Sequence, residues 1–224
     1  MRSREEAEES SRALELLIDR QVHRVGLAAA GPGAAWQIAV AAASGRVSVV
    51  VSVLIYAGGL LAMLGCSAAY NHSADASPRR EWLRRLDHAA IALMIAGTYT
   101  PFTVTKLTGT WSIAMTAGIW TIAGAGIAIK LLESRRLERA SVAFYLALGW
   151  MGLIALHPLA KALDPETLIL LGVGGMLYTL GVIFHLWRSL PFQTAVWHGF
   201  VLLAAGCHYA AVLEALKVHV ALSG

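Results

Sequence analysis

The spacing of the charged residues constrains the fold of this 224-residue chain more than any other sequence feature. Seven stretches contain no Asp, Glu, Lys or Arg, namely residues 25–45, 47–74, 88–105, 107–129, 140–160, 167–187 and 189–213. Each reaches or approaches the roughly 20 residues that a helix needs to cross about 30 Å of hydrocarbon. The charged residues lie between these stretches, in the first 24 residues, or after residue 213. We therefore expect an all-α polytopic membrane protein, a bundle of seven transmembrane helices.

The composition agrees with a surface that faces lipid. Hydrophobic residues make up 57% of the chain, charged residues only 14%, and the mean hydropathy is +0.61. A soluble domain usually carries about a quarter charged residues, which disfavours the alternative of a large soluble all-α protein. The net charge of +4 lies in the loops, so we expect membrane lipids as partners and no nucleic acid. The sequence assigns no oligomeric state.

The chain divides into three predicted parts. Residues 1–24 form a cytoplasmic N-terminal arm, residues 25–219 form the seven-helix membrane domain, and residues 220–224 form a short tail. Apolar residues in the arm favour an interfacial helix, with an unstructured tail as the alternative. In the first span, Gly31-Pro32-Gly33 predicts a kink or an interruption, because proline removes a backbone hydrogen bond.

The loop charges predict the orientation of the bundle. Eight basic residues follow the second and fourth stretches: Arg79, Arg80, Arg84, Arg85, Lys130, Arg135, Arg136 and Arg139. The loops after the first, third and fifth stretches carry only Arg46, Lys106 and Lys161. Since basic residues concentrate on the cytoplasmic side, we expect the N-terminus in the cytoplasm and the C-terminus outside.

Polar residues gather at the cytoplasmic ends of four predicted spans. Alternating the direction of successive spans places the following side chains at one level: Ser67, Tyr70, Asn71, His72, Ser73, Asp87, His88, His185, Gln193, Thr194 and His198. Ionisable groups inside a membrane are costly and mark candidate functional sites. The alternative is that these residues only mark helix ends that meet headgroups and water. His23 is expected at the interface, and His208, deeper in the last span, is expected to be a buried, hydrogen-bonded histidine.

Imidazoles beside a carboxylate suit Zn²⁺, which keeps an open position for water at catalytic sites. Such an ion acidifies its bound water and polarises a carbonyl group. Asp87 then orients a ligating histidine or holds the water as a general base. The alternative role for Asp87 is that of a first-turn anion favoured by the helix dipole. His198 lies four residues after Thr194, so both can face a common site.

Several segments resemble a known family. Residues 86–91 read Leu-Asp-His-Ala-Ala-Ile, and residues 95–102 read Ile-Ala-Gly-Thr-Tyr-Thr-Pro-Phe. Further segments read Ser-Ala-Ala-Tyr at 67–70, Leu-Tyr-Thr-Leu-Gly at 177–181, and Leu-Pro-Phe at 190–192 before Trp-His-Gly-Phe-Val-Leu at 197–202. Together they resemble the hemolysin III family, the bacterial relatives of the progestin and adipoQ receptors. The resemblance implies a seven-helix bundle in the bacterial plasma membrane with a cytoplasmic N-terminus.

The resemblance also implies chemistry similar to that of alkaline ceramidases. In this wider group, zinc is held by one histidine at the end of the second span and two in an H-x-x-x-H pattern in the seventh, with an aspartate opening the third. Asp87 matches the aspartate and His198 matches the second histidine of the pattern. The first histidine falls on Thr194, a poor zinc ligand, and the histidine of the second span falls on Asn71, one residue before His72. His72 or His185 could compensate.

These observations lead to one main hypothesis and two alternatives. The main hypothesis is a zinc-dependent membrane hydrolase that acts on a lipid amide or ester at a cytoplasm-facing cavity. His72, His198 and His185 are the candidate metal ligands, and Asp87 and Ser67 are the candidate catalytic residues. The first alternative is a non-enzymatic channel, pore-forming or membrane-homeostasis protein that lacks the metal. The second is a metal-free lipid-binding protein that senses bilayer composition.

Overall fold

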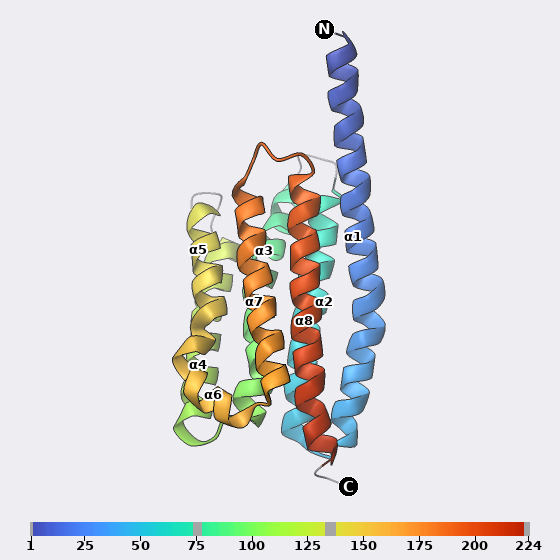
Figure 1. The fold of residues 1–224 in the computed structure, drawn as a ribbon. Helices are drawn as coiled ribbons and strands as arrows, with labels where there is room; N and C mark the ends of the chain where they lie inside the picture. The colour runs from blue at the N-terminus through green and yellow to red at the C-terminus, as the bar shows by residue number, and fades with distance from the viewer. Residues whose placement is uncertain (1, 74–77, 133–137, 222–224) are drawn as a thin grey trace.

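The computed structural model describes residues 2–73, 78–132 and 138–221, and within these ranges it contains helices and loops but no strand. The elements, in chain order, are α1 (Arg2–Ala43), α2 (Val47–Asn71), α3 (Pro78–Thr105), α4 (Gly109–Leu132), α5 (Glu138–Gly149), the 3₁₀ helix η1 (Trp150–Ala155), α6 (Leu156–Ala162), α7 (Pro165–Leu186) and α8 (Gln193–Ala221). The long helices run alternately up and down in one bundle (Figure 1). The N-terminal part of α1 extends beyond the bundle at one end, and the C-terminus lies at the other. The prediction of an all-α architecture is confirmed.

Six segments of the described chain are long and apolar enough to cross a membrane. They are Ser10–Ala43, Val47–Asn71, Gly109–Leu132, Ala140–Ala162, Pro165–Leu186 and Gln193–Lys217. The expected number was seven, and α3 is the helix that does not meet the composition. Its first turns are charged, and threonines dilute its apolar part. The reason is packing: most residues between 89 and 103 are buried, chiefly against α2 and α4, so α3 needs less lipid-compatible surface.

Helix α1 is continuous through the Gly31-Pro32-Gly33 segment, so the expected interruption was wrong. Tyr209 of α8 packs closely against this point. A Cβ atom at Gly33 would lie only 3.1 Å from the Tyr209 ring. The Tyr209 hydroxyl also donates a hydrogen bond to the Gly33 carbonyl at 3.0 Å. A neighbouring helix thus supports the backbone near the proline. The helix also passes residues 24 and 25 without a break, while residue 1 of the arm and residues 222–224 of the tail lie outside the described residues.

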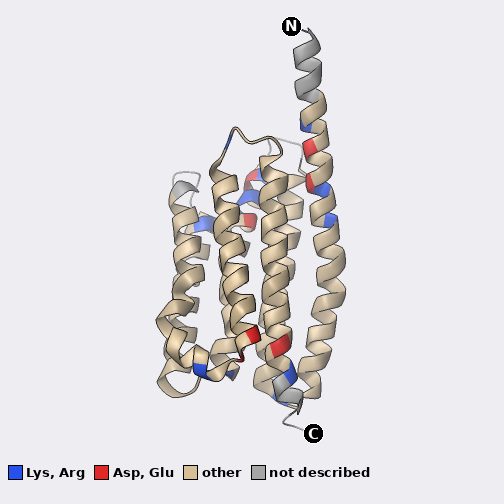
Figure 2. Cartoon of the chain, in the orientation of Figure 1, with Lys and Arg blue, Asp and Glu red and all other residues tan. Residues whose placement is uncertain are grey.

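Charged residues gather at the two ends of the bundle and leave its middle almost free of charge (Figure 2). This distribution is typical of a multi-pass membrane protein. Arg135 and Arg136, which contribute to the predicted orientation, lie outside the described residues. The orientation itself stays a prediction.

Close contact between α2 and α3 sets the level at which their ends meet. A Cβ atom on Gly59 would lie 3.2 Å from the Met94 Cα atom, and one on Gly97 would lie 3.2 Å from the Ile55 carbonyl oxygen. Small residues of this kind let two membrane helices approach backbone to backbone. The C-terminal end of α2 therefore lies beside the N-terminal part of α3, at the same end of the bundle as the start of α8.

Candidate functional site

Helix α1 carries a buried carboxylate and a buried imidazole on one face. Asp19 and His23 are four residues apart, which places them one turn apart on the same side of the helix. Each is only 3% exposed. Nδ1 of His23 donates a hydrogen bond to the backbone carbonyl oxygen of Asp19 at 2.9 Å and lies 3.4 Å from the Asp19 carboxylate. Buried ionisable groups need such partners, because burial without them is costly.

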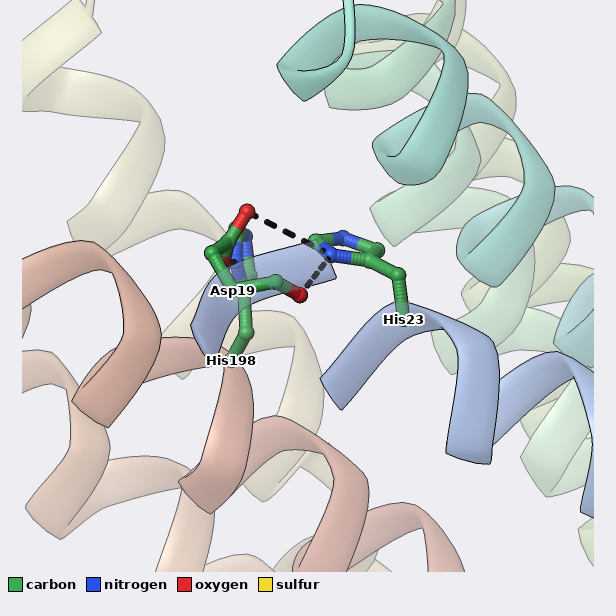
Figure 3. A group of neighbouring side chains, drawn as sticks. All are labelled: Asp19, His23 and His198. Atoms are coloured by element: carbon green, nitrogen blue, oxygen red, sulfur yellow. Dashed lines mark hydrogen bonds and ion pairs between the residues drawn. The ribbon is translucent and has the colours of Figure 1, made fainter. Parts of the chain in front are cut away.

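The third member of the group comes from the other end of the chain. Nδ1 of His198, on α8, lies 2.5 Å from Oδ1 of Asp19. The ring centroids of His23 and His198 are 4.5 Å apart. Figure 3 shows the three side chains pointing toward one another from α1 and α8. One potential ligand atom from each of Asp19, His23 and His198 lies within 4.8 Å of the others.

The hydroxyl group of Ser67, on α2, lies between the two imidazoles. Its Oγ atom is 3.1 Å from Nε2 of His23 and 3.5 Å from Nε2 of His198. Asp87, at the start of the apolar part of α3, is hydrogen-bonded to the same hydroxyl. The side-chain amide of Asn71 donates to the Ser67 backbone carbonyl at 2.9 Å and lies 3.4 Å from Oγ. Four helices therefore meet at Ser67.

The hydrogen bonds assign the tautomers of both histidines. A backbone carbonyl oxygen can only accept, so Nδ1 of His23 carries the ring proton. Nδ1 of His198 likewise donates to the carboxylate of Asp19. In the neutral rings, Nε2 of both His23 and His198 is then an unprotonated acceptor. Both of these lone pairs are directed to the region of Ser67.

A large cavity begins at this group and continues into the bundle. Its volume is about 1040 Å³, close to the upper end of the range of small-molecule sites. His23, Ser67, Asp87 and His198 line its polar end, whereas Asp19 does not line it. The cavity extends along α3, α5, η1, α7 and α8 past mainly apolar side chains as far as His208. The arrangement places polar chemistry at one end of a long apolar space.

Three of the residues singled out from the sequence lie together, and two others lie beside them. Ser67, Asp87 and His198 meet as described. The ring of His72 is 5.5 Å from that of His23, and its buried Nε2 atom has no hydrogen-bond partner among the described residues. Burial and the nearby His23 lower the pKa of His72, which favours the neutral imidazole. His185 is exposed, lies 4.9 Å from the ring of Trp197 and lines the cavity.

Two members of the site were missed by sequence reasoning. His23 was expected only to mark the interface, whereas its side chain is buried against α2 and α8 and belongs to the group. Asp19 was not considered at all. The available signal was the Asp-x-x-x-His spacing in α1, which puts both residues on one helix face. The expectation for His208 was correct in part: Nε2 donates to the Leu171 carbonyl at 3.3 Å, and the side chain is partly buried.

The chemistry of the donor set fits a metal ion. Two imidazoles and a carboxylate are the ligand types of catalytic zinc sites. Asp19 and His23 are almost fully buried and therefore shielded from water. The Asp19 carboxylate also contacts Nδ1 of His198 directly. The buried group of Asp19, His23 and His198 could therefore hold a metal ion.

Residues 18–209 match the family model described as "Haemolysin-III related". The chain belongs to the hemolysin III family. It is 35% identical over 191 residues to the "Hemolysin-3 homolog" of Bacillus subtilis (strain 168), covering 85% of this chain and 89% of the relative. It is 37% identical over 191 residues to "Hemolysin-3" of Bacillus cereus, covering 85% and 87%. The family match includes Asp19 and His23 of α1.

A more distant relative is the "Monocyte to macrophage differentiation factor" of Homo sapiens, which belongs to the wider group of progestin and adipoQ receptors. It is 28% identical over 174 residues, covering 74% of this chain and 71% of the relative. Membership of the hemolysin III family agrees with the six apolar helices, and both identify a multi-pass membrane protein.

Proposed function

We propose that this hemolysin III family member is a metal-dependent hydrolase of the bacterial plasma membrane that cleaves a lipid amide or ester. Helix α3 is counted as the seventh crossing, because it runs antiparallel to α2 and α4 over a similar length. The positive-inside rule then puts the N-terminus and the site in the cytoplasmic half of the membrane and the C-terminus outside.

The observation that carries the proposal is the position of the buried acid–histidine group at one end of the cavity. A lipid amide or ester has a polar carbonyl next to a long apolar chain. The polar end of the cavity, with His23, Ser67, Asp87 and His198, suits the carbonyl, and the apolar length of the cavity suits the acyl chain. Both parts of the ligand thus find matching surroundings in one continuous space.

The residues divide the work between them. Asp19, His23 and His198 would hold the metal, with zinc the ion that suits this donor set. When bound, such an ion supplies a Lewis acid and lowers the pKa of a bound water. Asp87 and Ser67, joined by a hydrogen bond, are placed to orient that water or the substrate carbonyl. His72 stands next to His23, and His185 lies at the rim of the cavity.

The non-enzymatic alternative, a pore or regulatory protein, is less well supported. A conducting pore needs polar groups along its length. Here the acidic, basic and histidine side chains that line the cavity gather at one end, apart from His208, which is the one histidine found deep in it among the described residues. A mainly apolar space with one polar end is better suited to a lipid chain than to ions.

The test is zinc content and fatty-acid release by the purified protein in detergent. The substrates are an N-acyl lipid and its ester counterpart, and the variants are His198→Ala and His157→Ala. His157 is the matched control, because it is exposed on α6. We expect about one zinc per chain and chelator-sensitive release, both lost in His198→Ala and kept in His157→Ala. Metal-free wild-type protein that releases no fatty acid after zinc is added would refute the proposal.

A further inference from the structure

Ser67 stands in a relationship to its neighbours that metal binding alone does not explain. Its hydroxyl faces two imidazole nitrogens, and both imidazoles are held from behind by one carboxylate. We propose that Ser67 is a nucleophile that takes up the acyl group when the site holds no metal, with His23 and His198 as its bases. This rests on the proposed function in one respect, that the substrate is an acyl lipid, and it adds a second chemistry at the same site.

The first line of evidence is the order of the three functional groups. Oδ1 of Asp19 lies 2.5 Å from Nδ1 of His198, whose Nε2 lies 3.5 Å from Oγ of Ser67. Carboxylate, imidazole and hydroxyl thus follow one another as in a serine hydrolase relay. The Asp19 carboxylate holds the proton of His198 on Nδ1, so the unprotonated Nε2 of His198 can accept the hydroxyl proton of Ser67.

A second relay runs through His23. Its Nδ1 atom is held by the Asp19 backbone carbonyl at 2.9 Å and lies 3.4 Å from the Asp19 carboxylate. Its Nε2 atom is 3.1 Å from Oγ of Ser67, which is within normal hydrogen-bond distance. The hydroxyl therefore has an imidazole on either side, and the Asp87 carboxyl is its third hydrogen-bond partner. The 3.1 Å contact makes His23 the better placed of the two in this structure.

Access to substrate comes from the cavity. Ser67, His23 and His198 line its polar end, so an acyl carbonyl that enters the cavity can reach Oγ. Asp19 lies on the far side of the imidazoles and acts only through them, as a positioning residue. Ser67 is 9% exposed, and limited contact with water strengthens the electrostatic contacts of its hydroxyl.

The amide of Asn71 donates hydrogen bonds to the proposed nucleophile. Its Nδ2 atom lies 3.4 Å from Oγ of Ser67 and is anchored by the bond to the Ser67 backbone carbonyl. Asn71 also lines the cavity. A donor held beside Oγ stabilises the negative charge that develops there as the hydroxyl proton leaves. An amide at this position is a poor metal ligand but a suitable donor.

The chemical step is a two-stage acyl transfer. Oγ of Ser67 attacks the acyl carbonyl carbon, and the hydroxyl proton passes to Nε2 of His23, the better placed of the two bases. The bond from carbon to the leaving nitrogen or oxygen breaks, and the histidine returns the proton to the departing amine or alcohol. A water then attacks the acyl–Ser67 ester, gives its proton to the histidine, and Ser67 leaves with that proton as the fatty acid is released.

Metal binding and nucleophile activation need different tautomers of the two imidazoles. The nitrogens that lie beside the Asp19 carboxylate are the Nδ1 atoms. A neutral imidazole that binds a metal through Nδ1 carries its proton on Nε2, which then cannot accept the proton of Ser67. The serine reaction therefore belongs to the metal-free protein, and its signature is an acyl or phosphonyl group attached to Ser67 after chelation.

The experiment treats chelated, metal-free protein in detergent with a long-chain alkyl fluorophosphonate and locates the adduct by peptide mass spectrometry. The variants are Ser67→Ala, Asp19→Asn and the control Ser52→Ala. Ser52 is a buried serine of the same helix whose hydroxyl donates to the Val49 carbonyl and which does not line the cavity. Thermal unfolding of each variant verifies that it is folded.

We expect one adduct on Ser67 in wild-type and Ser52→Ala protein, and none in Ser67→Ala. Labelling of Ser67 should be slower by about a hundredfold in folded Asp19→Asn.

Absence of an adduct on Ser67 in chelated wild-type protein would overturn the inference, as would an equal labelling rate in Asp19→Asn. If the zinc-loaded protein still hydrolyses the lipid in that case, the proposed metal-dependent function stands alone. If an adduct forms and zinc has no effect, the metal-dependent function fails and the serine chemistry remains.

Discussion

Nδ1 of His198 lies 2.5 Å from Oδ1 of Asp19, although the two residues are 179 positions apart in the chain. The contact joins the first helix of the bundle to the last. It also places an imidazole from α8 beside the imidazole that α1 supplies through His23. The site is therefore built by closing the bundle, and it does not exist within any single helix or hairpin.

Replacing Asp19 by alanine should destabilise the protein. The side chain of Asp19 is 4% exposed and contacts two histidines, so its loss leaves His198 without its acceptor and removes the carboxylate that lies 3.4 Å from Nδ1 of His23. Removing one partner of a buried charged pair costs about 3–5 kcal/mol. We expect a decrease of this order in the free energy of unfolding, measured by denaturant titration in detergent. His185 is exposed, so His185→Ala is the control and should change the free energy of unfolding by less than about 0.5 kcal/mol.

Gly174→Ala should weaken the packing of α7 against α8. A Cβ atom at this position would lie 2.4 Å from Cδ2 of His208 and 3.2 Å from the Ala204 carbonyl oxygen. Overpacking of this kind costs about 1–3 kcal/mol. The thermal midpoint should fall in Gly174→Ala and stay unchanged in Gly118→Ala, where nothing lies within 4 Å of the added atom. Equal midpoints for the two variants would show that α7 and α8 pack differently.

Thr194→His should strengthen metal binding. Residue 194 lies one turn before His198 on α8, so a histidine there shares a helix face with it. The Thr194 side chain is partly buried and its backbone N–H donates to Glu15 of α1, which keeps this turn next to the site. We expect zinc affinity to rise by at least about tenfold, or 1.4 kcal/mol, in competition titrations. His157→Ala should leave the affinity as in wild type.

The orientation can be tested with single cysteines in the loops. Thr108, between α3 and α4, and Ser189, between α7 and α8, are both exposed. In a background with Cys66 and Cys207 replaced by alanine, we expect Thr108→Cys to react with a membrane-impermeant maleimide in intact cells. Ser189→Cys should react only after lysis. The reverse pattern would place the N-terminus outside.

Much of the fold follows from the positions of charged residues. A membrane excludes charge, so the gaps between charges predict the spans, and the alternation of spans brings Ser67, Asp87 and His198 to one level. Helix α3 was harder to classify from the sequence, since its threonines and charges suit burial between helices as well as contact with lipid. Only the packing partners distinguish these two environments.

The contribution of α1 to the site could not be fixed from the sequence. Its 42 residues make a helix about 60 Å long, twice the thickness of the hydrocarbon layer. Hydropathy therefore does not determine which part of α1 lies beside the bundle. Arg20 and Arg24 are exposed and suggest an aqueous position, yet the residues directly before them, Asp19 and His23, are buried against α2 and α8. Tertiary contacts decide this register.

The most direct test of the account is the rate of fatty-acid release from an N-acyl lipid by His23→Ala, measured beside wild type after zinc is supplied and again after chelation. His23 takes part in both proposed chemistries, through Nε2 facing Ser67 and through its place in the metal-binding group. We predict that release falls by about a hundredfold or more, while the protein remains folded. Folded His23→Ala that releases fatty acid at the wild-type rate would contradict the account, because the reactive centre would then lie elsewhere.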